Sequence, residues 1–236
     1  MKIGCAIVAG GRGTRLGEEW VKVPKAIVPL LGRPMLYYSL HAFDQIKEIS
    51  RISVAVPKGE TGRFEKLIRI WGFSKKIEIV EGGETRSESV FNALSALASD
   101  PPDYVLIHDA ARPCVTPDMI DALLESESAA TLAHPASDTL REVNMGTISG
   151  EIDRSDIINI ETPQMFPYKK ILELHKSGQS GGELPDDTTL FTRAGESVKV
   201  VFHDDSNIKV TWREDISAAE GILFGREWSD VTEGED

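Results

Sequence analysis

The chain has 236 residues, of which 41% are hydrophobic and 27% charged, proportions that are ordinary for a soluble globular protein. Its formal net charge of -12 argues against a general nucleic-acid binder and against a binder of anionic membrane surfaces. No stretch approaches the length of a membrane-spanning helix. We therefore expect small-molecule partners, with neither nucleic acid nor membrane among them.

The cysteines and the start of the chain indicate the compartment. Cys5 and Cys114 are the only cysteines, and their spacing suits neither a disulfide framework nor a zinc site. The apolar stretch at the start is too short for a signal peptide and has no cleavage pattern. We expect two free thiols and a cytoplasmic protein.

A glycine-rich loop follows the first apolar run. Residues 3–8 predict a buried strand, and residues 10–15 read Gly-Gly-Arg-Gly-Thr-Arg before Pro24-Lys25. Glycines let backbone N–H groups approach a ligand closely, and clustered positive charge suits a polyphosphate. The alternative is an ordinary strand-to-helix turn with solvated basic side chains. The cluster runs against the acidic average of the chain and comprises Arg12, Arg15, Lys22 and Lys25.

Helix-like and strand-like patterns alternate after this loop. In chain order we predict a helix over 34–46, a strand over 52–56, a helix over 64–71, a strand over 77–80, a helix over 90–97, a strand over 104–107 and a helix starting at Thr116-Pro117. This alternation favours an α/β fold with an open, mostly parallel twisted sheet and helices on both faces. Ligands of such sheets bind beyond the carboxyl ends of the strands.

Three segments fall at carboxyl ends of predicted strands: the glycine loop, Gly82-Gly83 and His108-Asp109. The segment over 82–89 offers backbone, carboxylate and hydroxyl groups that could read a nucleobase edge, or it could simply be a capping box. Asp109 could bind Mg²⁺ together with phosphate oxygens, or it could form a structural ion pair with Arg112. Beside a polyphosphate loop we favour the metal.

Residues 137–161 lose the helical period, and short apolar pieces alternate with charges there. We predict a β-rich arm whose strand edges another subunit would cover; the alternative is a surface insertion. With no linker or repeat visible, we predict a single domain over 1–236 with this arm inserted.

The last third of the chain is less regular. We predict a helix over 168–176, an acidic loop over 183–187, strands over 198–202 and 208–211, a helix over 216–223 and a frayed acidic tail after Trp228. Asn207 and Lys209 would share one face of a strand. Alternatively, Lys209 is solvated beside Asp204 and Asp205. No histidine spacing indicates a catalytic or metal-binding role.

Five short motifs are together more specific than any of them alone. In order they are Pro24-Lys25, Gly82-Gly83-x-x-Arg86-x-x-Ser89, His108-Asp109-Ala110-Ala111-Arg112-Pro113, Thr162-Pro163-Gln164-x-Phe166 and Asn207-Ile208-Lys209-x-Thr211. In this combination the chain closely resembles the 2-C-methyl-D-erythritol 4-phosphate cytidylyltransferases over nearly its whole length. The resemblance implies a Rossmann-like nucleotidyltransferase fold with a β-rich dimerisation arm.

The resemblance also implies a reaction, in which CTP and a polyol phosphate give a CDP-polyol and pyrophosphate. Arg15 and Lys25 would hold the triphosphate and stabilise the transition state, helped by Lys209, and Asp109 would bind the divalent cation Mg²⁺. The nucleotide-binding residues that it implies are Ala9, Gly10, Gly11, Gly83, Glu84, Ser89 and Asp109.

In the family the arm reaches across a homodimer to the neighbouring site. Matching it implies that Thr139, Arg154, Thr162 and Arg112 contact the polyol phosphate. Two rivals are a cytidylyltransferase for ribitol or ribulose 5-phosphate and, more remotely, a sugar-1-phosphate nucleotidyltransferase. A non-catalytic nucleotide-binding regulator is a third alternative, although binding alone would not need Arg15, Lys25, Asp109 and Lys209 together.

Overall fold

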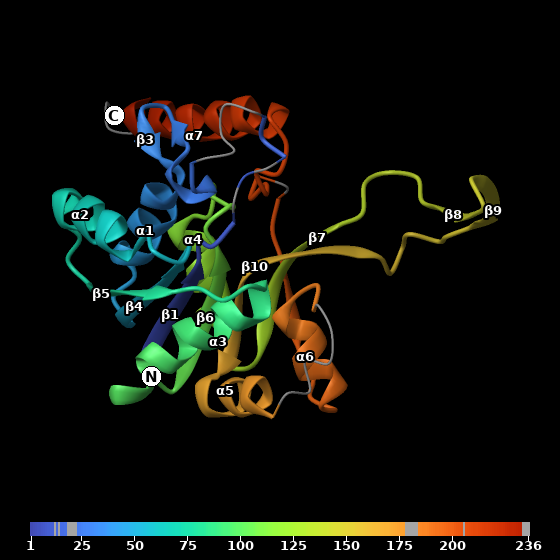
Figure 1. The fold of residues 1–236 in the computed structure, drawn as a ribbon. Coiled ribbons are helices and arrows are strands. Elements are labelled where there is room, and N and C mark those ends of the chain that lie inside the picture. Colours follow the sequence, from blue (N-terminus) through green and yellow to red (C-terminus); the bar gives the residue numbers. More distant parts are fainter. Residues whose placement is uncertain (12, 14, 18–22, 178–183, 205, 233–236) are drawn as a thin grey trace.

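The fold is seen in a computed structural model of the chain (Figure 1). It describes residues 1–232 except residues 12, 14, 18–22, 178–183 and 205. Our predictions for Arg12, Lys22, Glu183 and Asp205 concern residues outside the described part of the chain.

A twisted β-sheet forms the centre of the fold. Within the described residues it has seven strands in the order β11-β7-β10-β6-β1-β4-β5. Their bounds are β1 (Ile3–Val8), β4 (Ile49–Val56), β5 (Lys76–Glu81), β6 (Tyr104–Asp109), β7 (Ala130–Pro135), β10 (Ile158–Pro167) and β11 (Lys199–Phe202). Only β10 runs antiparallel, between β6 and β7. The predicted mostly parallel sheet is confirmed.

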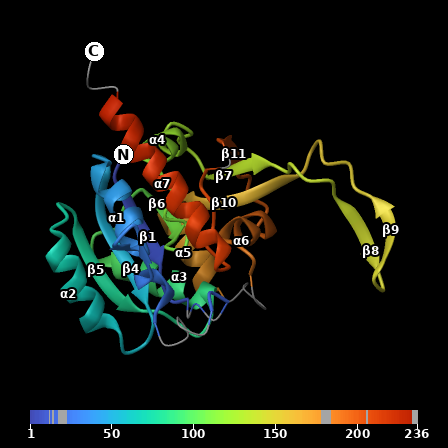
Figure 2. The ribbon, with the colours of Figure 1, turned by 90° about the horizontal axis from the view of Figure 1, so that it is seen from above.

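Helices cover both faces of the sheet, as predicted (Figures 1 and 2). One core cluster joins the sheet to α1 (Met35–Gln45), α2 (Thr61–Trp71) and α4 (Pro117–Leu124). A second joins the opposite face to α3 (Arg86–Ala96), α5 (Tyr168–Lys176) and α6 (Asp187–Arg193). Strands β1 and β6 lie between the two layers of helices, so they are near-continuous apolar runs. Their strand pattern is therefore clear in the sequence.

A third cluster closes the carboxyl edge of the sheet. It packs α7 (Glu214–Thr232) against the end of the glycine loop and the short hairpin β2 (Pro29–Leu30) and β3 (Arg33–Pro34). The 3-10 helix η2 (Lys25–Ile27) starts at the predicted site lysine. The tail that we predicted to be frayed after Trp228 continues as helix to Thr232. In the described residues, no helix is long and apolar enough to cross a membrane.

The predicted strand over 208–211 is wrong. The segment has no strand ladder; Val210 donates one backbone hydrogen bond to Ala111 as the chain passes over the sheet edge. Strands β7 and β10 and helix α6 were not predicted. Polar side chains and two prolines, Pro163 and Pro167, hide the strand pattern of β10.

The segment over 137–161 contains a β-hairpin, β8 (Arg141–Asn144) and β9 (Thr147–Glu151), that extends away from the body (Figures 1 and 2). Met145 and Gly146 at its turn have φ of 47° and 78°, the left-handed pair of a type I′ turn. The excursion ends earlier than we predicted, because Ile158 already pairs with Pro135 in the central sheet.

Candidate functional site

A cavity of about 930 Å³ lies at the carboxyl edge of the sheet, where the three predicted loops meet. Its lining comes from the ends of β1, β4, β5 and β6 together with the segment after β11. Ten predicted site residues line it: Ala9, Gly10, Gly11, Arg15, Lys25, Gly83, Glu84, Ser89, Asp109 and Lys209. The fold therefore brings together positions that lie up to 200 residues apart in the sequence.

The glycine loop folds back on the lysine that follows it. Lys25 N–H donates to the carbonyl of Gly11 at 3.0 Å, and this closes the loop. Gly13 has a φ of 65°, a conformation that glycine adopts without strain. The loop thus presents its backbone and Lys25 to the same cavity.

The second glycine segment leaves no room for a side chain. A Cβ on Gly83 would lie 2.2 Å from the Cβ of Glu88. The Thr85–Glu88 capping box that we considered for this segment is present at the start of α3. The Ser89 hydroxyl accepts from Gly83 N–H at 3.1 Å and donates to the Thr85 carbonyl at 2.9 Å. This side chain therefore fixes the loop, while Glu84 is exposed at the cavity.

Asp109 is a buried carboxylate between two cations. Its Oδ1 lies 2.9 Å from Arg86 Nε, and its Oδ2 lies 2.7 Å from Lys209 Nζ. Burial has the largest influence and would raise the pKa of Asp109. The charges of Arg86 and Lys209 outweigh it, however, and the pKa falls well below its usual range. Asp109 is therefore ionised across the physiological range.

Arg86 was quoted in the motif but not predicted as a site residue. Its Nη1 lies 2.8 Å from Asp187 Oδ2, and the other Asp187 oxygen lies 3.0 Å from His175 Nε2. Arg86 and Asp187 are 101 positions apart in the chain, so nothing local in the sequence reveals the pair. The contacts that run from His175 through Asp187 to Arg86 therefore fix the Asp109 carboxylate from the side of α3.

Arg15 and Lys25 supply positive charge from the loop. The Arg15 guanidinium stacks over Trp212, 5.4 Å from the ring centroid, a contact that no sequence pattern indicated. Burial, followed by the nearby charges of Lys209 and Arg15, lowers the pKa of Lys25 to about 8. Three positively charged side chains at one cavity favour the binding of an anion.

This pKa predicts an alkaline limb in the pH dependence. The profile of kcat/KM reports ionisations of the free protein. For the nucleotide substrate that the sequence predicts, kcat/KM therefore falls as Lys25 loses its proton above about pH 8. Initial rates at low nucleotide concentration across a pH series measure this. Lys25→Arg, which stays charged, shifts the limb to higher pH, whereas an unchanged limb in that variant would contradict the assignment.

Thr162 and Arg112 lie behind Asp109 and do not line the cavity. The Thr162 hydroxyl accepts from Asp109 N–H at 3.0 Å and also contacts His108, whose pKa burial lowers to about 3. Arg112 donates to the Asn207 carbonyl at 2.7 Å and pairs with Glu161 at 3.4 Å. The Asp109–Arg112 ion pair that we weighed is thus replaced by other partners. Lys209 pairs with Asp109.

Thr139 and Arg154 lie on the arm, exposed and outside the cavity lining. In one chain they do not meet the other predicted site residues. Their predicted contact with the second substrate stays a prediction, as do the contacts of Thr162 and Arg112.

The side chains at this edge of the sheet limit how a divalent cation could be bound. Among the described residues, no group of three or more His, Cys, Asp or Glu side chains could hold a metal ion. Within the described part of the chain, the carboxylates in the lining are Asp109 and Glu84, and Asp109 is the buried one. Mg²⁺ is often held by one or two carboxylates plus phosphate oxygens of a substrate. Asp109 fits such a shared site.

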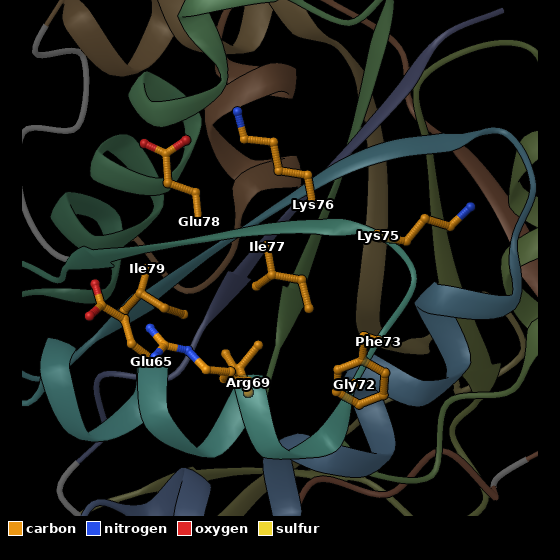
Figure 3. Close-up of a pocket in the computed structure, with 10 residues that line it drawn as sticks. Glu65, Arg69, Gly72, Phe73, Lys75, Lys76, Ile77, Glu78 and Ile79 are labelled. Carbon is orange, nitrogen blue, oxygen red and sulfur yellow. The ribbon is translucent and has the colours of Figure 1, made fainter.

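A second hollow, of about 680 Å³, lies between α2 and the edge strand β5 (Figure 3). Its lining includes the charged residues Glu65, Arg69 and Lys75. It contains none of the predicted site residues, so we place the chemistry in the cavity at the carboxyl edge.

Known proteins resemble this chain over most of its length. A family model described as 2-C-methyl-D-erythritol 4-phosphate cytidylyltransferase matches residues 3–225. Proteins of that name from Dictyoglomus thermophilum and Cereibacter sphaeroides strain KD131 are 37% and 39% identical, over 229 and 226 residues. The alignments cover 94% of this chain in both cases and 96% and 97% of the relatives.

The fold has solved counterparts as well. The crystal structure of 4-diphosphocytidyl-2C-methyl-D-erythritol synthase from Anaerococcus prevotii matches with a TM-score of 0.79 and 29% identity, covering 94% of this chain and 98% of that one. The 2-C-methyl-D-erythritol 4-phosphate cytidylyltransferase of Francisella tularensis matches with a TM-score of 0.76 and 27% identity, covering 94% and 100%. The likeness therefore extends over most of the chain.

Proposed function

Because the chain belongs to the 2-C-methyl-D-erythritol 4-phosphate cytidylyltransferase family, we propose that it transfers the cytidylyl group of CTP to 2-C-methyl-D-erythritol 4-phosphate. The products are CDP-methylerythritol and pyrophosphate, and the reaction serves isoprenoid biosynthesis. The observation that carries the proposal is the cavity that Arg15, Lys25 and Lys209 line together with the Asp109 carboxylate.

The reaction joins two anions, so charge neutralisation is the main catalytic task. A phosphate oxygen of the polyol phosphate attacks the α-phosphorus of CTP, and the bond from that phosphorus to the bridging oxygen breaks as pyrophosphate leaves. Lys25 and Arg15 hold the triphosphate from the glycine loop, and Lys209 adds its charge from the segment after β11. Together they offset the charge that develops on the phosphorane oxygens.

Asp109 would hold Mg²⁺ together with the triphosphate oxygens. The bound cation supplies charge neutralisation and helps pyrophosphate to leave. Arg86 keeps the carboxylate ionised and oriented, since it holds one oxygen at 2.9 Å. Lys209, which holds the other oxygen, is free to share its charge with the phosphates because its side chain is 43% exposed.

The segment over 82–89 is suited to reading the cytosine edge. Gly83 permits close approach, and Glu84 offers an exposed carboxylate and backbone at the cavity wall. The Ser89 hydroxyl shapes the loop and retains acceptor capacity. Gly10 and Ala9 also line the cavity, from the turn after β1, and a Cβ on Gly10 would lie 3.5 Å from the Ser89 hydroxyl oxygen.

We also propose a homodimer joined by the arm. The hairpin exposes apolar side chains that a single chain leaves uncovered, with Val143 65%, Met145 100% and Ile148 68% exposed. Thr139 and Arg154, which are remote from the cavity of their own chain, would then reach the cavity of the partner subunit. Both cysteines are reduced and buried, which fits the cytoplasm as the compartment.

The arm assignment predicts a selective defect. Arg154→Ala raises KM for the polyol phosphate while CTP affinity stays near that of the wild type, because a bidentate phosphate contact is lost. Steady-state kinetics with each substrate varied in turn measures this. Arg141→Ala, on the same hairpin, is the matched control. Equal loss of CTP affinity in Arg154→Ala would show that the arm does not bind the second substrate.

A substrate matrix tests the activity. Purified protein with Mg²⁺ is offered each NTP with methylerythritol phosphate, ribitol 5-phosphate, ribulose 5-phosphate or glucose 1-phosphate, and pyrophosphate release is followed. We expect release with CTP and methylerythritol phosphate. Release with UTP and glucose 1-phosphate alone, or with no pair at all, would refute the proposal.

A further inference from the structure

A buried carboxylate occupies the root of the arm, where β7 and β10 leave the sheet side by side (Figure 2). Glu161 is 2% exposed, and nitrogen atoms from three other segments converge on it. His134 Nδ1 lies 2.8 Å from Oε1, and Asn207 Nδ2 lies 2.7 Å from Oε2. Arg112 Nη1 and His203 Nε2 lie at 3.4 Å and 3.1 Å.

Only a carboxylate suits this position. Asn207 and Arg112 present donors, each imidazole can present one, and an ionised carboxylate is the side chain whose two oxygens only accept. Burial is the largest influence and would raise the pKa of Glu161. The nearby His203 imidazole and the charge of Arg112 outweigh it and hold the pKa below its usual range. Glu161 is therefore an anion inside the protein.

The contacts join the arm to the catalytic segment. On the arm side, His134 belongs to β7, and its other ring nitrogen lies 3.0 Å from Asn159 on β10. On the site side, Asn207 is fully buried, donates also to the Thr162 carbonyl at 2.9 Å, and precedes Lys209 by two residues. That segment forms no strand ladder, so its side-chain contacts, together with the one backbone hydrogen bond from Val210 to Ala111, hold it in place.

We propose that Glu161 is a positioning residue that holds the segment from Asn207 to Lys209 against the root of the arm. Lys209 then sits over Asp109, at 2.7 Å, only while this junction is intact. The kinetic part of this inference rests on the proposed function. The structural part does not, because it concerns how one segment of the chain is held.

Glu161→Gln is the first test, because it keeps the shape and turns one acceptor oxygen into a donor amide that faces other donors. We expect kcat per CTP-binding site to fall by about tenfold, less than the roughly 10²-fold that a 1 Å misplacement of a catalytic group can cost. The turnover rate is divided by the number of CTP-binding sites that calorimetry measures, so unfolded protein does not lower the value. Glu78→Gln is the matched control, since Glu78 pairs with Arg51 on the far edge of the sheet.

A double-mutant cycle separates positioning from a general structural role. In the Lys209→Ala background, Glu161→Gln should lower kcat no further, because its effect runs through Lys209. A multiplicative loss in that background, or an unchanged kcat in the single variant, would overturn the proposal. His134→Asn, which removes only the arm-side contact, should give a smaller loss than Glu161→Gln.

Hydrogen exchange tests the junction without any turnover. In Glu161→Gln the amide of Val210, which bonds to the Ala111 carbonyl, should exchange faster by about tenfold, and Glu78→Gln should leave it unchanged. Unchanged exchange would overturn the inference even in an active enzyme. An inactive wild type with accelerated exchange in the variant would instead refute the proposed function and leave the junction standing.

Discussion

Lys25→Ala lowers kcat by about 10²–10³-fold, the scale for losing one preorganised charge contact to the transition state. Lys25 lies at the cavity with Arg15 and Lys209, and their repulsion in the empty cavity is relieved as negative charge develops on the phosphates. Single-turnover kinetics with saturating CTP and Mg²⁺ measures the rate of cytidylyl transfer.

Two further variants make this result specific. Lys25→Arg should recover part of the loss, because charge is kept while the geometry changes. Lys75→Ala, in the hollow beside β5, should leave kcat unchanged. A Lys25→Ala enzyme with wild-type turnover would remove the glycine loop from the catalytic account.

Asp109→Asn has the second large effect, on both activity and stability. Turnover falls by about 10²-fold or more, because the carboxylate that would share the cation with the triphosphate is lost. The free energy of unfolding falls by about 3 kcal/mol, the low end for breaking a buried ion pair, since Lys209 is partly exposed. Urea denaturation measures the second effect.

The comparison variant is Asp187→Asn. It changes the other carboxylate that pairs with Arg86, and it leaves Asp109 ionised beside Lys209. We expect it to lose stability with a much smaller loss of kcat. Similar kcat values in the two variants would mean that Asp109 matters for the fold and has no direct part in the reaction.

The central strands and the edge that they form could be predicted because their pattern is local. β1, β4 and β6 are buried runs between turn signals, and the strands of parallel sheets place their carboxyl ends on one edge. The glycines and charged residues that follow β1, β5 and β6 were therefore enough to predict the cavity at this edge. The capping box before α3 was predictable for the same reason, since its two residues are three apart.

What the sequence could not show depends on distant partners. Asp187 binds Arg86 across 101 positions, and Glu161 binds Asn207 across 46. No sequence pattern indicates that Trp212 lies under the Arg15 guanidinium. The segment over 208–211 has an alternating pattern, but it passes over the sheet edge and finds no strand to pair with.

The central claim is that this cavity joins a cytidylyl group to a polyol phosphate. Phosphorus NMR of the protein with CTP, Mg²⁺ and methylerythritol phosphate tests it most directly. The account predicts that the triphosphate and phosphomonoester signals decline together while a diphosphate diester and pyrophosphate appear in equal amounts. Persistence of both starting signals, or release of inorganic phosphate without the diester, would contradict it.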